Sequence, residues 1–170
     1  MSTNREKEKR FLEITGQYKT VISKVCFLYQ SSSSSFEDLY QEVLLNLWQG
    51  IDSFRGDAKI STWIYRTALN TCISWHRRNI RHTDRHIGID DLIIEPTDTQ
   101  DDTSLSEQYK ELLSMIAALG AVDKAIITLW LDGNPYEEIS RITGLSVANV
   151  ATKLHRIKER LANEARKRSV

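Results

Sequence analysis

Aromatic and basic side chains alternate between residues 63 and 81, a pattern whose chemistry suits nucleic acid. The aromatic members are Trp63, Tyr65 and Trp75, and the basic ones are Arg66, His76, Arg77, Arg78 and Arg81. Flat rings can stack on unpaired bases, and cationic groups neutralise the phosphates between them. The same residue types also occur on ordinary buried and solvated helix faces. The pattern therefore leaves nucleic-acid contact and simple helix packing both open.

An amphipathic helix is expected just before this segment. Its apolar positions recur at helical period and are Leu39, Val43, Leu47 and Ile51, flanked by Tyr40, Leu44 and Trp48. Its opposite face is polar and consists of Asp38, Gln41, Glu42 and Asn46. Trp48 is expected in the core, because an aromatic ring at helical spacing more often packs than stacks on a base.

A second helix is predicted to begin near Ala58 and to run at least to Arg78. Gly56 supplies the permissive backbone of the intervening turn, and Asp57 is expected to cap the second helix. The apolar side of this helix comprises Ile60, Ile64, Ala68 and Cys72, while Arg66, Asn70, Arg77 and Arg81 form one polar stripe. That stripe could follow a phosphate backbone.

Upstream, apolar spacing predicts one more helix over residues 8–29, and the serine run 31–35 is expected to be an exposed connector. Cys26 and Cys72 both fall in expected helices. They are too few and too isolated in the sequence for a disulfide framework or a zinc cluster, so we expect buried, reduced thiols.

The C-terminal third predicts a helix-turn-helix. Asn134 is expected to cap a short helix, Tyr136 to Thr143, with Pro135 at its first position. Gly144 makes the turn, and Ser146 caps a longer helix. Small Ser140 and apolar Val150 suit the close approach of the two helices, and the outward face presents Ala148, Asn149, Thr152, Lys153 and Arg156. An ordinary helical hairpin is the alternative, but turn, cap, core and basic face all favour DNA binding.

Composition supports a soluble, helical chain. The sequence has 170 residues, 41% of them apolar, with only two prolines. Its charged N-terminus is followed by no long apolar run, so neither a secretory signal nor a membrane span is predicted, and the expected compartment is the cytoplasm.

The formal net charge is zero, with 23 basic and 23 acidic residues, but the two signs are segregated along the chain. Residues 84–107 are mostly acidic and include Pro96, whereas residues 153–168 are strongly basic. The acidic stretch lacks helical periodicity and is interpreted as a flexible linker. It also contains His82, His86, Asp90 and Asp91, whose spacing fits no common metal site, so no metal or other cofactor is expected. The predicted domains are residues 1–81 and 107–170, joined by a linker over 82–106.

Together the two halves resemble the extracytoplasmic-function sigma factors, the small two-domain initiation factors of bacterial RNA polymerase. DLYQEVLLNLWQGIDSFRGDAKISTWIYRTALNTCISW is similar to the family's domain two, and YEEISRITGLSVANVATKLHRIKERL to its domain four. The resemblance covers nearly the whole chain. It implies an all-α fold of two small helical domains and a non-enzymatic protein that recruits polymerase to a subset of promoters and helps to melt them.

The resemblance also implies roles for residues. The polymerase-binding set is Asp38, Gln41 and Glu42. The set that binds and melts the −10 element is Phe54, Arg55, Lys59, Trp63, Arg66, Asn70, Trp75, Arg77 and Arg78. The set that recognises the upstream element is Ser146, Ala148, Asn149, Thr152, Lys153, His155 and Arg156. The chain departs from the family pattern at Ala148 and Ala151, so the resemblance names no bases.

The implied partners are core RNA polymerase, through its clamp coiled coil and flap, promoter DNA and an anti-sigma factor; no membrane insertion is expected. Two alternatives remain at this level. One is a stand-alone helix-turn-helix regulator that needs no polymerase. The other is a helical hydrolase or metal enzyme built on the cluster from His82 to Asp91, which would require bound metal.

Overall fold

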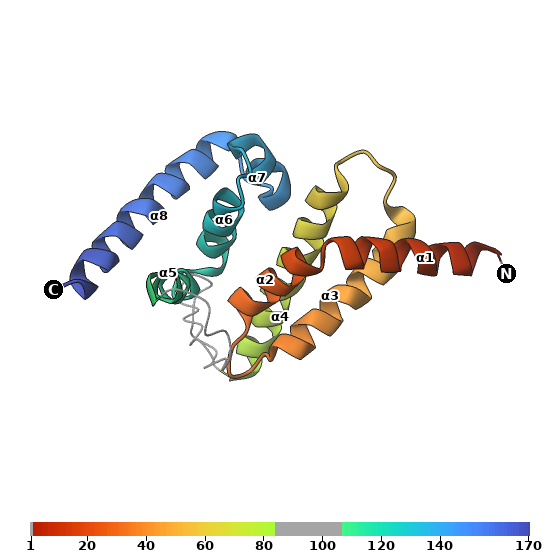
Figure 1. Ribbon diagram of the computed structural model, residues 1–170, viewed down its shortest axis with the longest axis horizontal. Helices are drawn as coiled ribbons and strands as arrows, with labels where there is room; N and C mark the ends of the chain where they lie inside the picture. The colour runs from red at the N-terminus through yellow and green to blue at the C-terminus, as the bar shows by residue number, and fades with distance from the viewer. Residues whose placement is uncertain (1, 84–106) are drawn as a thin grey trace. The chain divides into compact units, whose positions relative to one another are not determined.

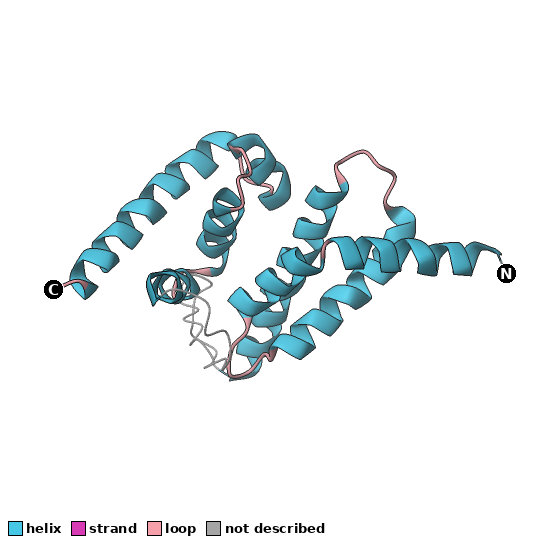
Figure 2. Ribbon diagram, in the orientation of Figure 1, coloured by secondary structure: helices cyan, strands magenta, loops and turns pink. Residues whose placement is uncertain are grey.

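The computed structural model describes residues 2–83 and 107–170, and the regular elements within these ranges are helices (Figure 2). The chain divides into two compact units, Met1–Thr83 and Asp84–Val170. The predicted all-helical, two-domain fold is confirmed. The predicted linker lies almost wholly outside the described residues, as do His86, Asp90 and Asp91 of the cluster considered for a metal.

The first unit is built from α1 (Ser2–Gln17), α2 (Lys19–Tyr29), α3 (Phe36–Gly50), the short 3₁₀ turn η1 (Ile51–Ser53) and α4 (Ile60–Thr83). Helices α2, α3 and α4 pack on one another, and α1 crosses the end of α3 where η1 begins (Figure 1). The most deeply buried core side chains, at most 1% exposed, include Ile22, Val25, Leu39, Val43, Leu47, Ile51, Ile64 and Ala68. The apolar stripes expected for α3 and α4 are therefore confirmed as buried faces.

The single helix predicted over residues 8–29 is wrong, because the chain breaks into two helices at Tyr18. Tyr18 has φ −103° and ψ 16°, outside the helical region. Gly16 lies just before it, and glycine is a weak helix former. The break lets α1 leave the direction of α2 and lie across α3 and η1.

The serine run is more than an exposed connector. Ser31 and Ser34 form an isolated bridge, and Ser34 is fully buried. The Asn79 side chain on α4 donates to Ser33 O and Ser34 Oγ, and Ser35 Oγ accepts from the backbone N–H of Asp38 at 3.1 Å. The segment thus caps α3 and ties it to α4, roles that low sequence complexity does not reveal.

Between α3 and α4, Gly56 has φ 82°, which confirms the need for glycine in this turn. Helix α4 begins at Ile60 rather than near Ala58. The prediction that Asp57 caps this helix is therefore wrong. Asp57 instead lies exposed in the loop, where it lines a surface hollow.

The second unit contains α5 (Glu107–Ala117), α6 (Ala121–Leu131), α7 (Tyr136–Thr143) and α8 (Val147–Arg168). Helices α6, α7 and α8 pack on one another around a core that includes Ile126, Leu129, Ile139, Val150 and Leu154. The bounds of α7 and the start of α8 agree with the predicted helix-turn-helix.

Two features of this motif are confirmed, but the positions predicted for Asn134 and Pro135 are wrong. Gly144 ends α7 in the left-handed region with φ 77°, and Ser146 Oγ accepts from the Asn149 N–H at 3.1 Å. Asn134, however, is not the cap of α7, because Pro135 occupies that position. The Asn134 side chain donates backwards to Leu129 O at 2.9 Å and so fastens the turn to α6.

The two cysteines are confirmed as buried and free, but they are not isolated in space. Cys26 on α2 and Cys72 on α4 lie close enough to share a side-chain hydrogen bond. That bond, together with burial, raises the pKa of the Cys72 thiol well above its usual value. A protonated, buried thiol is a poor nucleophile, so the Cys72 thiol contributes packing rather than reactivity near neutral pH.

Along the described ranges, none of the helices combines the length and the apolar character that crossing a membrane requires.

Candidate nucleic-acid interfaces

A hollow of about 360 Å³ lies beside the loop between η1 and α4. Ligand pockets in proteins are typically roughly 300–1,000 Å³, so this space can hold a group the size of a nucleobase. Five of the residues predicted to bind and melt the −10 element line it together, namely Phe54, Arg55, Trp63, Arg66 and Asn70. The loop supplies the first two, and successive turns of α4 supply the others.

Two aromatic rings, tilted against each other, form part of the wall of this hollow. The ring centroids of Phe54 and Trp63 are 5.2 Å apart with an interplanar angle of 31°. Both side chains are only half-buried, so ring surface stays available to a ligand. Arg55 and Arg66 are exposed at the same hollow and outnumber the single carboxylate of Asp57. The hollow therefore combines aromatic faces with a positive bias, which suits an unpaired base and its phosphate.

Other members of the predicted −10 set do not line this hollow. Lys59 is exposed in the loop. Arg77 lies seven residues beyond Asn70, about 10 Å further along α4 at 1.5 Å per residue. Arg78 lies over the Trp75 ring at 5.6 Å, and Trp75 Nε1 is buried with no hydrogen-bond partner among the described residues. Trp75, Arg77 and Arg78 therefore lie apart from the hollow, on the later turns of α4.

Sequence reasoning missed three residues of the hollow, namely Ser53, Thr62 and Thr67. Asp57 and Ala58 also line it, and they belong to the loop 54–59, which the resemblance to sigma factors implies is the loop that captures a base. The spacing of the two threonines did carry a signal: Thr62, Arg66 and Asn70 recur every four residues, and Trp63 and Thr67 are also four apart. The threonines add hydroxyl groups that can both donate and accept hydrogen bonds.

The predicted polymerase-binding residues share one face of α3. Asp38 and Gln41 are exposed, while the side chain of Glu42 is 25% exposed and its Oε1 lies 3.7 Å from Arg78 Nη2. Leu45, one turn further on, is 48% exposed and extends the face with apolar surface. Its offset from the buried stripe of α3 and its spacing from Gln41 and Glu42 could have identified it from the sequence.

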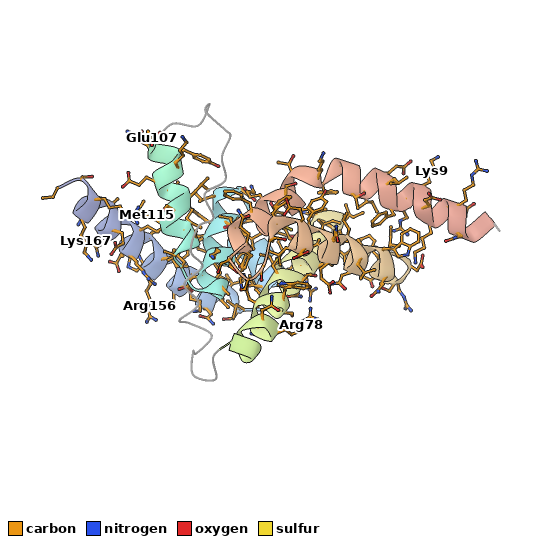
Figure 3. The ribbon with its side chains drawn as sticks, turned by 90° about the horizontal axis from the view of Figure 1, so that it is seen from below. Lys9, Arg78, Glu107, Met115, Arg156 and Lys167 are labelled. Atoms are coloured by element: carbon orange, nitrogen blue, oxygen red, sulfur yellow. The ribbon has the colours of Figure 1, made fainter. Side chains whose placement is uncertain are left out.

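On α8, the predicted upstream-element residues form a convex, exposed surface. Ala148, Asn149, Thr152, His155 and Arg156 are all exposed. Figure 3 shows Arg156 projecting away from its helix. A protruding helix whose first turns carry small and polar side chains has the shape that enters a major groove.

Lys153 differs from its neighbours on α8. It is half-buried, and its Nζ lies 3.5 Å from Asp123 Oδ1 on α6. His155 Nε2 lies 3.6 Å from Glu159 Oε1 on the same helix. Ser146 uses its hydroxyl as the cap. Arg156 is engaged in no ion pair with the described residues, so it is the cation of this set most available to a phosphate.

The paired architecture, with a base-sized aromatic hollow in one unit and a helix-turn-helix in the other, is that of a helical protein suited to binding nucleic acid. Comparison with known families is more specific. Residues 15–82 match the Sigma-70 region 2 family, and residues 109–161 match the Sigma-70 region 4 family. The chain belongs to the extracytoplasmic-function sigma factors and acts with RNA polymerase in transcription initiation.

Several curated relatives support this assignment. The RNA polymerase sigma factor YlaC of Bacillus subtilis is 30% identical over 143 residues, covering 82% of this chain and 83% of the relative. The ECF RNA polymerase sigma-E factor of Escherichia coli K12 is 27% identical over 167 residues, covering 92% of this chain and 87% of the relative. These alignments cross both units, so the order of the two regions is shared.

Solved structures share the fold. The sigma factor RpoE from Bartonella quintana, solved with the anti-sigma factor NepR, aligns with a TM-score of 0.75 and 21% identity, covering 91% of this chain and 96% of the other. CnrH, solved with the cytosolic domain of CnrY, aligns with a TM-score of 0.64 and 16% identity, covering 94% of this chain and 90% of the other. At these identities the likeness concerns the fold alone.

Proposed function

We propose that the hollow beside Phe54 and Trp63 captures an extruded base of the promoter's −10 element, and that the rest of the chain brings polymerase and duplex DNA to it. The observation that carries this proposal is the convergence of two packed aromatic rings and two arginines on one base-sized space. Extruding a base costs a few kcal/mol of unpairing and unstacking. Stacking on aromatic side chains recovers about 1–3 kcal/mol per base, so a built hollow can offset that cost.

The exposed face of α8 is proposed to bind the upstream promoter element. Ala148, Asn149 and Thr152 lie where a recognition helix meets base edges, and Arg156 lies further along, where phosphates pass. The single helix-turn-helix offers few cations, so it would bind duplex DNA weakly without a partner. That weakness is consistent with a protein that works as part of a larger polymerase complex.

The face of α3 with Asp38, Gln41 and Glu42 is proposed to dock on the clamp coiled coil of core polymerase, with the flap as a further contact of the chain. Two carboxylates beside exposed Leu45 suit a partner surface that is basic with an apolar centre. An anti-sigma factor is a second proposed partner, because two relatives of this fold were solved with one bound or with a partner domain. The protein itself performs no chemistry in this scheme and works in the cytoplasm, where polymerase meets promoters.

Co-elution and transcription with bacterial core polymerase test this function. The purified chain should form a complex with core polymerase and initiate from specific fragments of a genomic library, which would also identify its promoter. Asp38→Arg should abolish complex formation by reversing charge on the docking face. Glu13→Arg, an equal charge change on exposed α1, is the matched control and should bind normally. Tight promoter binding by the free chain, unaffected by Asp38→Arg, would instead indicate a stand-alone regulator.

A further inference from the structure

Helix α1 contacts α3 and η1 next to the base-sized hollow, whose lining residues all come from the η1–α4 region. The Sigma-70 region 2 match begins at residue 15, so most of α1 lies outside it. Three side chains on one face of α1 contact this region: Lys7 and Phe11 meet residues beside the hollow, and Arg10 meets Phe54, which lines it. Their spacing of three and four residues places them on consecutive turns of the same helix face.

Lys7 and Phe11 anchor α1 to the end of α3 and to η1. Lys7 Nζ lies 2.6 Å from Asp52 Oδ2 on η1 and 4.6 Å from the centre of the Trp48 ring. The ring of Phe11 meets Trp48 edge-on, with centroids 5.3 Å apart at 85°. Although Lys7 sits in a highly charged helix, its side chain is only 19% exposed. These contacts hold the turn that leads directly into Phe54.

Arg10 acts on Phe54 itself. Its guanidinium carbon lies 5.9 Å from the centre of the Phe54 ring, and that ring in turn packs on Trp63. Arg10, Phe54 and Trp63 therefore form a chain of ring and cation contacts whose last two members line the hollow. The backbone N–H of Phe54 makes only a long bond of 3.4 Å to Ile51 O, so side-chain contacts carry much of the restraint on this residue.

We propose that α1 is a working part of the base-holding site, with Arg10 as the positioning residue that keeps Phe54 against Trp63. The ligand of this site is an unpaired nucleobase. Arg10 does not touch the base but acts on it through the Phe54 ring. The proposal rests on the function proposed above for the hollow. Base capture then depends on α1, a helix that lies mostly outside the region 2 match. Loosening the contacts of α1 should weaken base capture and leave duplex recognition by α8 unchanged.

Arg10→Ala is the central variant, and Lys9→Ala is its matched control. Lys9 is the neighbouring cation on α1, its side chain is 79% exposed, and it projects away from the unit (Figure 3). Both changes remove one positive charge, and both place alanine, a strong helix former, in the same helix. A third variant, Arg10→Lys, keeps a cation near the ring and should restore part of the lost affinity.

The assay is binding of the full chain with core polymerase to a pre-melted probe of a promoter selected from the genomic library. Each unpaired non-template nucleotide is replaced in turn by an abasic one. At the captured position, wild type should lose affinity on the abasic probe. Arg10→Ala should weaken binding to the intact probe by about two- to fivefold, the effect of one exposed cation–π contact, and should add no further loss on the abasic probe. Lys9→Ala should match wild type on both.

Each other outcome identifies which idea fails. If wild type binds intact and abasic probes equally at every position, the base-holding function is wrong, and the role of α1 falls with it. If wild type needs the base but Arg10→Ala binds as wild type does, the role of Arg10 is wrong while the hollow stands. If Arg10→Ala is equally impaired on intact and abasic probes, Arg10 only stabilises the fold, which thermal unfolding of the variants would also show.

Discussion

The two units arrange their proposed nucleic-acid-binding side chains in opposite ways. In the first, residues from η1, the loop and α4 line a concave hollow, where the Phe54 ring packs on Trp63 and Arg10 of α1 lies over Phe54 from outside. In the second, the candidate DNA-binding residues lie along one exposed helix face, most of them without contact to another element. A concave site suits a base removed from its stack, whereas a protruding helix suits an intact major groove.

The comparison also separates two kinds of dependence on the fold. The hollow is formed by three chain segments, η1, the loop and α4, and α1 contacts one of its lining residues, so changes distant in sequence should affect it. The α8 face needs little more than a helix that begins at Val147 and a buried side that fixes its rotation. The following predictions test that difference, from the largest expected effect to the smallest.

Phe54→Ala should weaken binding of the polymerase complex to pre-melted DNA by about 1–3 kcal/mol, because a stacking ring is lost. The same variant should bind a duplex that carries only the upstream element as wild type does.

Asn149→Ala should weaken binding to that upstream duplex by up to about 3 kcal/mol, the discrimination of a bidentate base contact, and leave binding to pre-melted DNA unchanged. Fluorescence anisotropy on the two probes measures both. Equal losses on both probes for either variant would contradict a division of labour between the units.

Lys124 on α6 is a fully buried amine, and it makes the stability of the second unit depend on pH near neutrality. Burial lowers the pKa of Lys124 from 10.5 to about 7. Between these values the unfolded chain binds more protons than the folded one, so the free energy of unfolding rises with pH. From pH 7 to pH 9 the gain should be roughly 2 kcal/mol at 1.36 kcal/mol per pKa unit.

Urea unfolding of wild type and Lys124→Met at pH 7, 8 and 9 measures this effect. The methionine variant keeps similar apolar bulk but has no titrating amine, so its stability should rise about 2 kcal/mol less over this interval. Hydrogen exchange should locate the difference in α6 rather than α3. Parallel pH curves for the two proteins would show that Lys124 keeps its charge in the folded state.

Two serine caps provide the smallest and most closely matched test. Ser35 Oγ accepts from Asp38 N–H at the start of α3, and Ser146 Oγ accepts from Asn149 N–H at the start of α8, both at 3.1 Å. Each Ser→Ala change should cost about 1 kcal/mol of stability. Ser35→Ala should lower polymerase binding and Ser146→Ala upstream-duplex binding, each measured against Ser→Gly, which costs only a few tenths. If Ser35→Ala lowered upstream-duplex binding, or Ser146→Ala lowered polymerase binding, the two units would be energetically coupled.

The sequence predicted the second unit more fully than the first. Gly144, Ser146 and Val150 specify turn, cap and core within eleven residues of Ser140, so local chemistry determines the motif and the outward face follows from helical period. Asn134 was misplaced because asparagine suits both a cap and a side-chain bond to a preceding carbonyl, and only the position of Leu129 O decides between them. The DNA contacts of α8 stay predictions.

In the first unit, the sequence indicated Phe54, Arg55, Trp63, Arg66 and Asn70 as one functional set, and the structure brings these five together. It did not indicate that Trp75, Arg77 and Arg78 lie apart from the hollow, because all of them lie on one helix and helical period alone does not show where a hollow ends. Nor did it reveal that Cys26 meets Cys72, a contact between helices far apart in the chain.

The sequence by itself determined the helical class, the two-part order of the chain and the faces that are buried, since these depend on residue type and on a period of 3.6 residues. The family followed from two motifs in a fixed order. Only the tertiary structure decided which side chains share a space. The break at Tyr18 sends α1 across η1 and places Arg10 over Phe54, a contact between residues 44 positions apart that no local pattern encodes.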